Sequence, residues 1–249
     1  MKWGFFSLTH IVSLFIGAGL IIGLYFLLKQ MSEKGRSTLL FVLSFSGIAA
    51  ILFNLLVWNS PLEYLPFHLC SLNAMVLPFA VRKRNNLLAN LLLLWSLGAL
   101  VALVVNSAQA EYEIFSFTFF FYFFPHVLEF GIPILLFKFG YVEKKLKYIW
   151  TTVGITLVAF VIIHLINLAI NSYCLKNGVL NPSGEIIQVN YMFSITPDNP
   201  VLALFYNWIP YPFWFMLPVI PIVVVYLCSI YAKQIIEFVR SKRSSPQEN

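Results

Sequence analysis

The sequence predicts an all-α membrane protein, a polytopic bundle of seven transmembrane helices. Hydrophobic residues make up 60% of the 249 residues and charged residues only 10%, and the mean hydropathy is +0.83. Soluble domains carry about 25% charged residues, so this composition excludes a sizeable soluble domain. The chain also divides into seven apolar runs, each close to the length of roughly 20 residues that a transmembrane helix needs.

The runs cover, in order, residues 5–28, 38–58, 64–81, 87–106, 115–137, 148–172 and 201–232. The first run is retained as a helix, because the polar residues from Lys29 to Arg36 follow it in place of a small-residue cleavage motif. The Phe-rich start of the fifth run predicts a lipid-facing or packed helix surface. The last run contains Pro210, Pro212, Pro218 and Pro221, which predict a kink.

The distribution of basic residues predicts the orientation of the helices. Of the 16 Lys and Arg residues, all except Lys2 and Lys176 follow the first, third, fifth or seventh run. Basic residues gather on the cytoplasmic side of membrane proteins. The sequence therefore predicts an N-terminus outside the cell, a cytoplasmic C-terminus and a multi-pass protein of the cell membrane. The same explanation accounts for the net charge of +6, so we do not predict nucleic-acid binding.

The sequence predicts one transmembrane helical domain over residues 1–240 and a disordered cytoplasmic tail over residues 241–249. The tail is polar and has no apolar periodicity. The longest predicted connection, about residues 173–200, carries several turn signals, among them Asn177-Gly178 and Asn181-Pro182. Connections of this length are usually functional or disordered.

All four histidines of the chain lie within the predicted helices. With a rise of about 1.5 Å per residue, His10 and His68 would lie roughly 8 Å below the outer helix ends, His164 roughly 12 Å and His126 roughly 15 Å. Polar and ionisable side chains inside the membrane normally face the bundle interior. The pattern predicts a single histidine-rich polar cavity that opens outward.

Glu129 is the only carboxylate deep in a predicted span, and it follows His126 by three residues, so both project from one helix face. A carboxylate there can orient a neighbouring imidazole for acid–base chemistry. Cys70 and Asn73 share a face of the third predicted helix, and His164, Asn167 and Asn171 share a face of the sixth.

Simpler interpretations stay open at this stage. A buried polar side chain in a membrane helix often serves only as a hydrogen bond between helices, and a single cysteine is more often a small hydrophobe than a nucleophile. Zinc would accept histidine and carboxylate ligands. However, no tight ligand spacing such as H-E-x-x-H occurs, so we predict neither a metal nor a cofactor.

Three segments resemble a known family. They are Leu65-Pro66-Phe67-His68-Leu69-Cys70-Ser71-Leu72, then Pro125-His126 followed by Ile132-Pro133-Ile134-Leu135, and Asn190-Tyr191-Met192-Phe193. Together with His10, their order and spacing resemble the bacterial YwaF-like membrane proteins, which belong with the animal transmembrane protein 164 family. The resemblance extends from about residue 7 to residue 230.

The resemblance implies an acyltransferase that moves a fatty acyl chain onto a lysophospholipid. The animal relatives use a cysteine nucleophile followed directly by a histidine, and a second histidine on a later helix. His68 and His126 match the two histidines, but Phe67 occupies the position of the nucleophile. Cys70, about one helical turn further on, is the residue that would have to replace it.

Two classes of function follow from these residues. In the first, a lipid-modifying enzyme (an acyltransferase or a lipid hydrolase) acts on a membrane lipid. His126, tuned by Glu129, is the base, and it either activates Cys70 as nucleophile or deprotonates a lipid hydroxyl directly, while His68 or an Asn stabilises the oxyanion. The remaining predicted site residues would bind the substrate: His10, Asn73, His164, Asn167, Asn190 and Tyr191. In the second, a proton-coupled transporter or binding protein for a small solute uses the same polar groups.

Overall fold

The computed structural model describes residues 1–105, 107–197, 200–206 and 219–244, and within these ranges it contains helices and loops but no β-strand. The helices are α1 (Leu8–Gln30), α2 (Glu33–Leu43), α3 (Ser46–Val57), α4 (Leu69–Lys83), α5 (Asn86–Val104), α6 (Phe117–Lys138), α7 (Lys147–Asn177), α8 (Pro200–Tyr206), α9 (Val219–Ile230) and α10 (Ala232–Ser244). Two short 3₁₀ turns, η1 (Ser107–Gln109) and η2 (Tyr191–Phe193), lie in the connections.

Five segments are long and apolar enough to cross a membrane: α1, the pair α2–α3, α5, α6 and α7. The bent pair α9–α10 would make a sixth. The chain is therefore a multi-pass, all-α membrane protein, as predicted. The exact number of seven spans and the orientation of the termini stay predictions.

Side-chain caps fix where several helices begin. Ser7, Ser32, Asn85 and Ser116 each accept a hydrogen bond from a backbone N–H in the first turn of the helix that follows, which satisfies a donor that has no partner within the helix. At the other end, α7 stops at Gly178, whose positive φ of 60° suits glycine. These ends agree with the predicted runs to within a few residues.

The predicted helix over residues 64–81 is wrong at its start, because α4 begins at Leu69 and His68 is its N-cap residue. Pro66 disfavours helical geometry at Leu65. The segment before α4 is instead held by the connection after α7: the Tyr191 hydroxyl donates to the Leu62 carbonyl, and the Met192 N–H donates to His68 Nδ1. His68 is thus not inside a helix.

The predicted helix over residues 38–58 is also interrupted, at Ser44 and Phe45, which separate α2 from α3. Small polar residues and glycine are common at helix bends, and here Ser44, Ser46 and Gly47 surround the break. The Ser44 hydroxyl donates to the Phe41 carbonyl at 2.6 Å, so the break is hydrogen-bonded internally.

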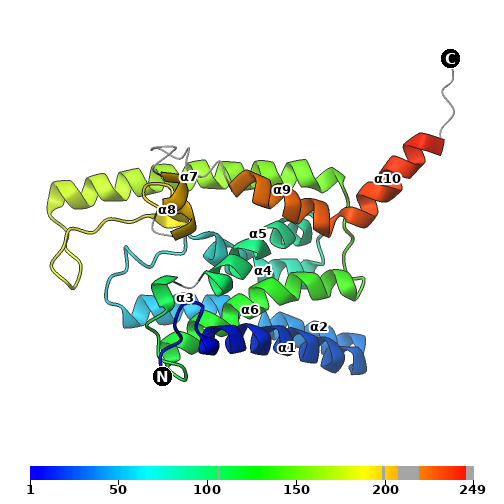
Figure 1. The fold of residues 1–249 in the computed structure, drawn as a ribbon, viewed down its shortest axis with the longest axis horizontal. Helices are drawn as coiled ribbons and strands as arrows, with labels where there is room; N and C mark the ends of the chain where they lie inside the picture. Colours follow the sequence, from blue (N-terminus) through cyan, green and yellow to red (C-terminus); the bar gives the residue numbers. More distant parts are fainter. Residues whose placement is uncertain (106, 198–199, 207–218, 245–249) are drawn as a thin grey trace, which may run out of the picture.

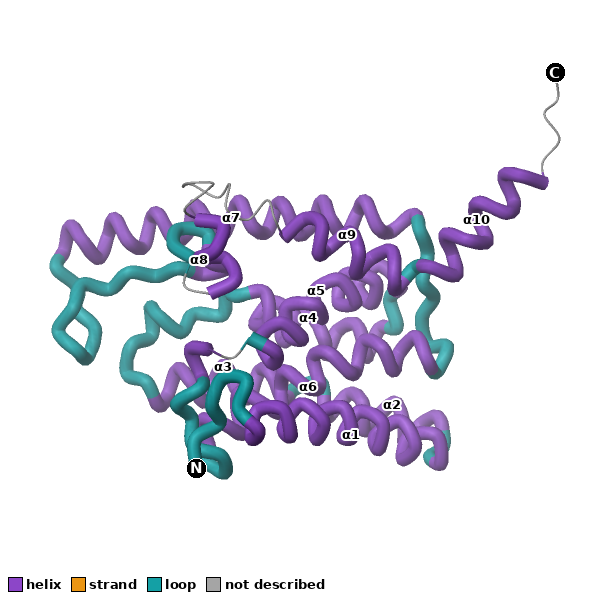
Figure 2. The backbone as a smooth tube through the Cα atoms, viewed as in Figure 1, coloured by secondary structure: helices purple, strands orange, loops and turns teal. Residues whose placement is uncertain are grey.

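The helices form layers, with α7 and α9 along one side, α4 and α5 in the middle, and α6, α1, α2 and α3 on the other side (Figure 1). Figure 2 shows the helices joined by loops at the two ends of the bundle, with one long connection after α7. The main apolar core lies where α4, α5 and α6 pack together, around Leu92, Trp95 and Ile132. α1 and α7 expose most of their apolar surface, as expected for helices that contact lipid.

The crossing of α3, α4 and α6 is very close at Gly47. A Cβ atom on this glycine would lie 2.5 Å from the Cβ of Ala74 on α4 and 2.5 Å from Oε1 of Glu129 on α6. Small residues at such crossings let membrane helices approach closely. The sequence therefore places Glu129 in a tight contact between three helices.

α7 is longer than the membrane requires. Its 31 residues correspond to about 46 Å at 1.5 Å per residue, compared with about 30 Å for the hydrocarbon core of a bilayer. In Figure 1 its C-terminal end extends past the rest of the bundle and runs beside the long connection that follows it. This end of the helix forms a support for that connection.

The seventh predicted run, residues 201–232, is described only in part. Residues 207–218, with Pro210, Pro212 and Pro218, lie outside the described residues. After them, α9 ends at Ile230, and α10 begins at Ala232 and leaves at an angle of 73°. Of the predicted tail, residues 241–244 belong to α10, and residues 245–249 lie outside the described residues.

The Gly47 crossing leads to a stability prediction. Gly47→Ala should lower the free energy of unfolding by about 1–3 kcal/mol, because the added methyl group has no room and α4 would have to move. Thermal unfolding of the purified protein in detergent measures this. Gly19→Ala in α1 is the matched control, since nothing lies within 4 Å of the position that its Cβ atom would take; equal losses in both variants would contradict the tight crossing.

Candidate functional site

The contacts of the described residues sort the ten predicted site residues into three groups. His10 lies near the N-terminus. A second group, around η2, contains His68, His164, Asn167, Asn190 and Tyr191. A third group, where α4 and α6 pack together, contains Cys70, Asn73 and Glu129, and His126 lies one turn before Glu129 on α6.

His10 is completely buried in the first turn of α1, and both of its ring nitrogens are used. Nε2 lies 2.8 Å from the carbonyl of Leu103 on α5, and Nδ1 accepts from the Phe6 N–H at 3.1 Å. Because a carbonyl can only accept, Nε2 carries the proton and Nδ1 does not. His10 is therefore a neutral histidine that ties the N-terminal segment to α5, and no ring nitrogen is left for a base.

The second group is built on two asparagines of α7. Asn171 donates to the Val189 carbonyl at 2.9 Å and accepts from the Val189 N–H at 2.7 Å. One helical turn earlier, Asn167 donates to the Tyr191 carbonyl at 2.8 Å and accepts from the Tyr191 N–H at 3.0 Å. The spacing of the two asparagines on the helix matches the spacing of the two loop residues that they bind. Four residues of helix rise about 6 Å, and two residues of extended chain cover about 6.6 Å.

His164, one turn before Asn167, continues the same row. Its Nδ1 lies 3.0 Å from the hydroxyl of Ser194, which also accepts from Asn167 at 2.9 Å. Asn190 binds the next part of the loop, where it accepts from the N–H of Ile195 at 2.9 Å. The amide and imidazole side chains thus act in place of a neighbouring β-strand, and they satisfy loop backbone groups that water cannot reach.

The loop held in this way is strained. Met192 and Phe193 both have positive φ, 54° and 53°, a region that bulky residues rarely adopt and that costs of order 1–3 kcal/mol per residue. The Met192 N–H donates to His68 Nδ1 at 3.3 Å. A neutral His68 with an accepting Nδ1 carries its proton on Nε2, which makes that nitrogen a donor.

Tyr191 joins this loop to the segment before α4. Its ring is almost completely buried, and it packs edge-on against the rings of Phe67 and His68 at centroid distances of 5.4 and 5.5 Å. Burial raises the pKa of the Tyr191 phenol to about 12, so the hydroxyl stays neutral and acts as the donor to Leu62. Phe67, at the position where the related proteins carry the nucleophile, is therefore part of an aromatic contact.

The third group surrounds Glu129, which is buried on α6. The Asn73 amide donates to the Glu129 backbone carbonyl at 3.4 Å. The Cys70 thiol is half-buried at the second residue of α4, and it lies within electrostatic interaction range of the Glu129 carboxyl. Tyr122, on the turn before His126, interacts with both Cys70 and Glu129.

His126 has a fixed tautomer. Its Nδ1 lies 2.6 Å from the Tyr122 backbone carbonyl, so Nδ1 must be the donor and Nε2 carries a lone pair. The ring is half-buried and packs against the Tyr122 ring at a centroid distance of 4.4 Å. This is the orientation that a general base requires, with one nitrogen held by a backbone carbonyl and the other able to accept a proton.

In the part of the chain that the structure describes, three buried polar atoms near Glu129 have no hydrogen-bond partner: Ser46 Oγ, Asn73 Oδ1 and Glu129 Oε2. They come from α3, α4 and α6, the helices that cross at Gly47. Buried polar groups are nearly always paired. A cluster without partners is therefore a place where a proton or a ligand group would be stabilised.

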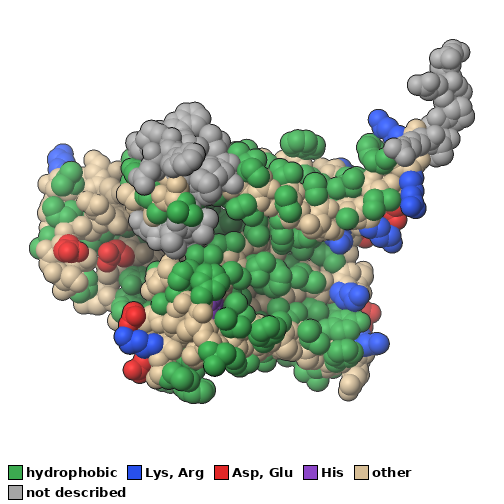
Figure 3. Space-filling model, viewed as in Figure 1, with side chains coloured by type: hydrophobic (Ala, Val, Ile, Leu, Met, Phe, Trp, Pro, Cys, Tyr) green, Lys and Arg blue, Asp and Glu red, His purple; other side chains and the backbone are tan. Residues whose placement is uncertain are grey.

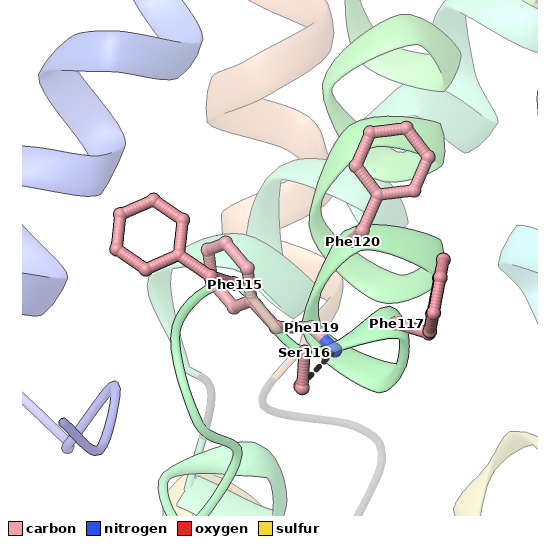
Figure 4. A pocket seen from close by; sticks show the side chains of 5 residues that line it. All are labelled: Phe115, Ser116, Phe117, Phe119 and Phe120. Carbon is pink, nitrogen blue, oxygen red and sulfur yellow. Dashed lines mark hydrogen bonds between the residues drawn. The ribbon is translucent and has the colours of Figure 1, made fainter.

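Two surface depressions lie away from these groups. One, of about 380 Å³, is lined by Phe115, Ser116, Phe117, Phe119 and Phe120 at the start of α6 (Figure 4). The other, of about 540 Å³, lies along α2 between Met31 and Val42. The first is a mainly aromatic surface of the kind that contacts acyl chains, as the Phe-rich run predicts.

Among the described residues, no three His, Cys, Asp or Glu side chains are close enough together to hold a metal ion. Sequence reasoning missed several residues that shape the site, notably Ser194, Tyr122 and Ser46. The spacing of Asn167 and Asn171 was a usable signal for the contact with the loop. Nothing in the sequence pointed to Ser194 or to the backbone geometry at Met192.

Comparison with known proteins identifies a family. The sequence model of the TMEM164 family matches residues 5–231, which is nearly the whole chain. No curated protein and no solved structure matches the chain.

The row of asparagines gives the second prediction. Asn167→Ala should lower the free energy of unfolding by about 2–4 kcal/mol, because it leaves the Tyr191 N–H and carbonyl buried without partners. Hydrogen exchange of residues 188–194 should accelerate in parallel. Asn177→Ala is the control on the same helix, since its amide makes only an exposed contact with Tyr173. Unchanged exchange in Asn167→Ala would show that α7 does not hold the loop.

Proposed function

This chain belongs to the TMEM164 family, and we propose that it transfers a fatty acyl chain between phospholipids of the cell membrane. We place it with the YwaF-like bacterial members, on the motifs described above. The observation that carries the proposal is the group at the α4–α6 contact: a histidine with an accepting nitrogen, a buried carboxyl one turn away, and a cysteine in electrostatic range of that carboxyl.

The proposal includes seven passes across the membrane, with the N-terminus outside. In support, α2 continues into α3 as one span, and the described N-terminal and C-terminal ends lie at opposite ends of the bundle (Figure 1). Lys and Arg side chains gather at the end that carries α10 (Figure 3), which is the cytoplasmic end by the positive-inside rule. α4, with 15 residues, would be the short third pass, completed by the loop before it.

Cys70 is the proposed nucleophile. It lies in the first turn of α4, and because it is held beside the Glu129 carboxyl, a base has to remove the thiol proton before the sulfur can attack. Phe67, which occupies the position of the family nucleophile, is packed against Tyr191. Because α4 begins at Leu69, Phe67 is not on the same helix as Cys70, and the two residues lie on opposite sides of the N-cap residue His68.

His126 is the proposed base. Its Nε2 takes the proton of the Cys70 thiol, and the thiolate attacks the ester carbonyl of a donor phospholipid. A carbon–sulfur bond forms, the ester carbon–oxygen bond breaks, and His126 returns the proton to the departing lysophospholipid alkoxide. In the second half, His126 deprotonates the hydroxyl of an acceptor lysophospholipid, and that oxygen attacks the thioester carbonyl. A carbon–oxygen bond forms, the carbon–sulfur bond breaks, and His126 returns the proton to the released Cys70 thiolate.

Two neighbours support this chemistry. Glu129 lies one turn after His126 and stabilises the imidazolium when it carries the proton. His68, which accepts at Nδ1 from Met192, presents an Nε2 donor two residues before Cys70, as the oxyanion of an attacked ester requires. The half-buried positions of Cys70 and His126 suit a lipid that approaches from the bilayer.

One observation favours a second candidate, a proton-coupled carrier. The unpaired atoms of Ser46, Asn73 and Glu129 form a buried polar cluster between helices, and carboxyl groups in such positions serve as proton relays in transporters. In this function Glu129 is essential and Cys70 is not. The two candidates therefore make opposite predictions for the thiol.

The enzyme proposal predicts a covalent intermediate. After exposure to phospholipid, intact-protein mass spectrometry should find an acyl adduct that hydroxylamine removes. Cys70→Ser should abolish the adduct, and His126→Ala should slow its formation about 10²- to 10⁴-fold. Cys228→Ser is the matched control, because Cys228 is an exposed thiol on α9 and its replacement should change nothing.

Either of two results would count against the enzyme. An adduct that persists in Cys70→Ser would remove the assigned nucleophile. If wild type forms no adduct and Glu129→Gln, but not Cys70→Ser, abolishes proton uptake into proteoliposomes, the carrier function would replace acyl transfer.

A further inference from the structure

The last described helix, α10, is amphipathic. Ile235, Ile236 and Val239 project within about 100° of one another on a helical wheel, and Phe238 lies next to them. Lys233, Glu237 and Arg240 occupy the opposite side. Apart from Ile235, these apolar side chains remain largely uncovered, with exposed fractions of 50% for Ile236, 53% for Phe238 and 43% for Val239.

The helix is also strongly basic. Its sequence contains the basic residues Lys233, Arg240, Lys242 and Arg243 and a single acidic residue, Glu237. Lys242 lies toward the apolar side, where its ammonium group is 5.5 Å from the centroid of the Phe238 ring. A lysine in this position can keep its stem on apolar surface and its charge at the polar boundary.

The direction of α10 is set by the helix before it. α9 runs along α5, because the Tyr226 hydroxyl donates to the Leu93 carbonyl at 2.8 Å and lies 2.8 Å from the Ser96 hydroxyl. α5 is one of the segments able to cross the membrane. In Figure 1, α10 leaves the end of the bundle obliquely, at 73° to α9, and extends beyond the helices that could cross the membrane.

The bend itself is anchored. Tyr231, the single residue between the two helices, is almost completely buried, and its hydroxyl donates to Asn90 on α5. The Lys144 ammonium donates to the Ile230 carbonyl at 3.0 Å, which satisfies a group at the end of α9. Side chains of the bundle therefore hold Ile230 and Tyr231, the point from which α10 leaves.

We propose that α10 lies on the membrane surface and binds the headgroups of anionic phospholipids. The bilayer is the partner that fits both observations on α10, an uncovered apolar side and an excess of positive charge. Basic side chains also gather at this end of the bundle (Figure 3), so they and α10 would attract anionic headgroups together. The inference is independent of acyl transfer, and its test does not use enzymatic activity.

Hydrogen exchange of the full-length protein in lipid nanodiscs tests the proposal. Nanodiscs of phosphatidylcholine alone are compared with nanodiscs that also contain phosphatidylglycerol. Amides of residues 234–243 should exchange about tenfold more slowly in the anionic nanodiscs, since each basic residue near such a surface adds to the attraction. Amides of α9 should not change, because α9 is held by the bundle.

Charge variants separate lipid binding from the general behaviour of a helix end. Replacing Lys233, Arg240 and Lys242 together by Gln should remove the difference between the two nanodiscs. Glu237→Gln, the matched control on the same polar side, should keep or enlarge it. Equal exchange of the wild-type helix in both nanodiscs would overturn the proposal. Slower exchange of α10 that is seen only in nanodiscs with two protein copies would also overturn it, because the apolar side of α10 would then bind a second copy of the chain.

Discussion

At Gly47, three helices approach so closely that a methyl group on α3 would overlap both α4 and α6. Membrane helices gain little from apolar contact with one another, because lipid is equally apolar, so close packing of small residues decides how they assemble. Here that packing encloses the Glu129 carboxyl and sets Asn73 and Cys70 on the neighbouring helix beside it. The polar centre of the molecule is therefore a result of the helix crossing at Gly47.

Around this crossing, two sets of polar contacts fix parts of the chain that helix packing alone would leave loose. His10 ties the N-terminal segment to α5 through a buried hydrogen bond to Leu103. Asn167, Asn171 and His164 hold the loop after α7, and that loop in turn places Tyr191 and Met192 against the segment that carries His68. Three of the four histidines thus contact loops or the N-terminal segment, whereas Nδ1 of His126 is held by the Tyr122 carbonyl within α6, which leaves its Nε2 as the accepting nitrogen.

The apolar runs predicted the positions of α1, α5, α6 and α7 well, because length and hydropathy are local properties of the sequence. The loop before α4 and the bend between α9 and α10 depend on distant partners, such as Tyr191 for Leu62 and Asn90 for Tyr231, which no local pattern reveals. For the same reason, the depth of a histidine in a predicted helix did not show its neighbours. The sequence expected four histidines around one cavity, whereas the contacts assign them to three groups. The roles of Cys70, His126 and Glu129 rest on their placement together and stay proposals.

The central claim is that His126 carries an unprotonated Nε2, as the proposed base for Cys70 requires. Nitrogen-15 NMR of histidine-labelled protein in bilayers at neutral pH measures this directly, since it distinguishes a protonated ring nitrogen from one with a lone pair. The hydrogen bond to the Tyr122 carbonyl predicts a proton on Nδ1 of His126, while the contacts of His10 predict a proton on Nε2 of that residue. A signal from His126 with the proton on Nε2 would contradict this claim, because Nε2 could then not accept the proton of the Cys70 thiol.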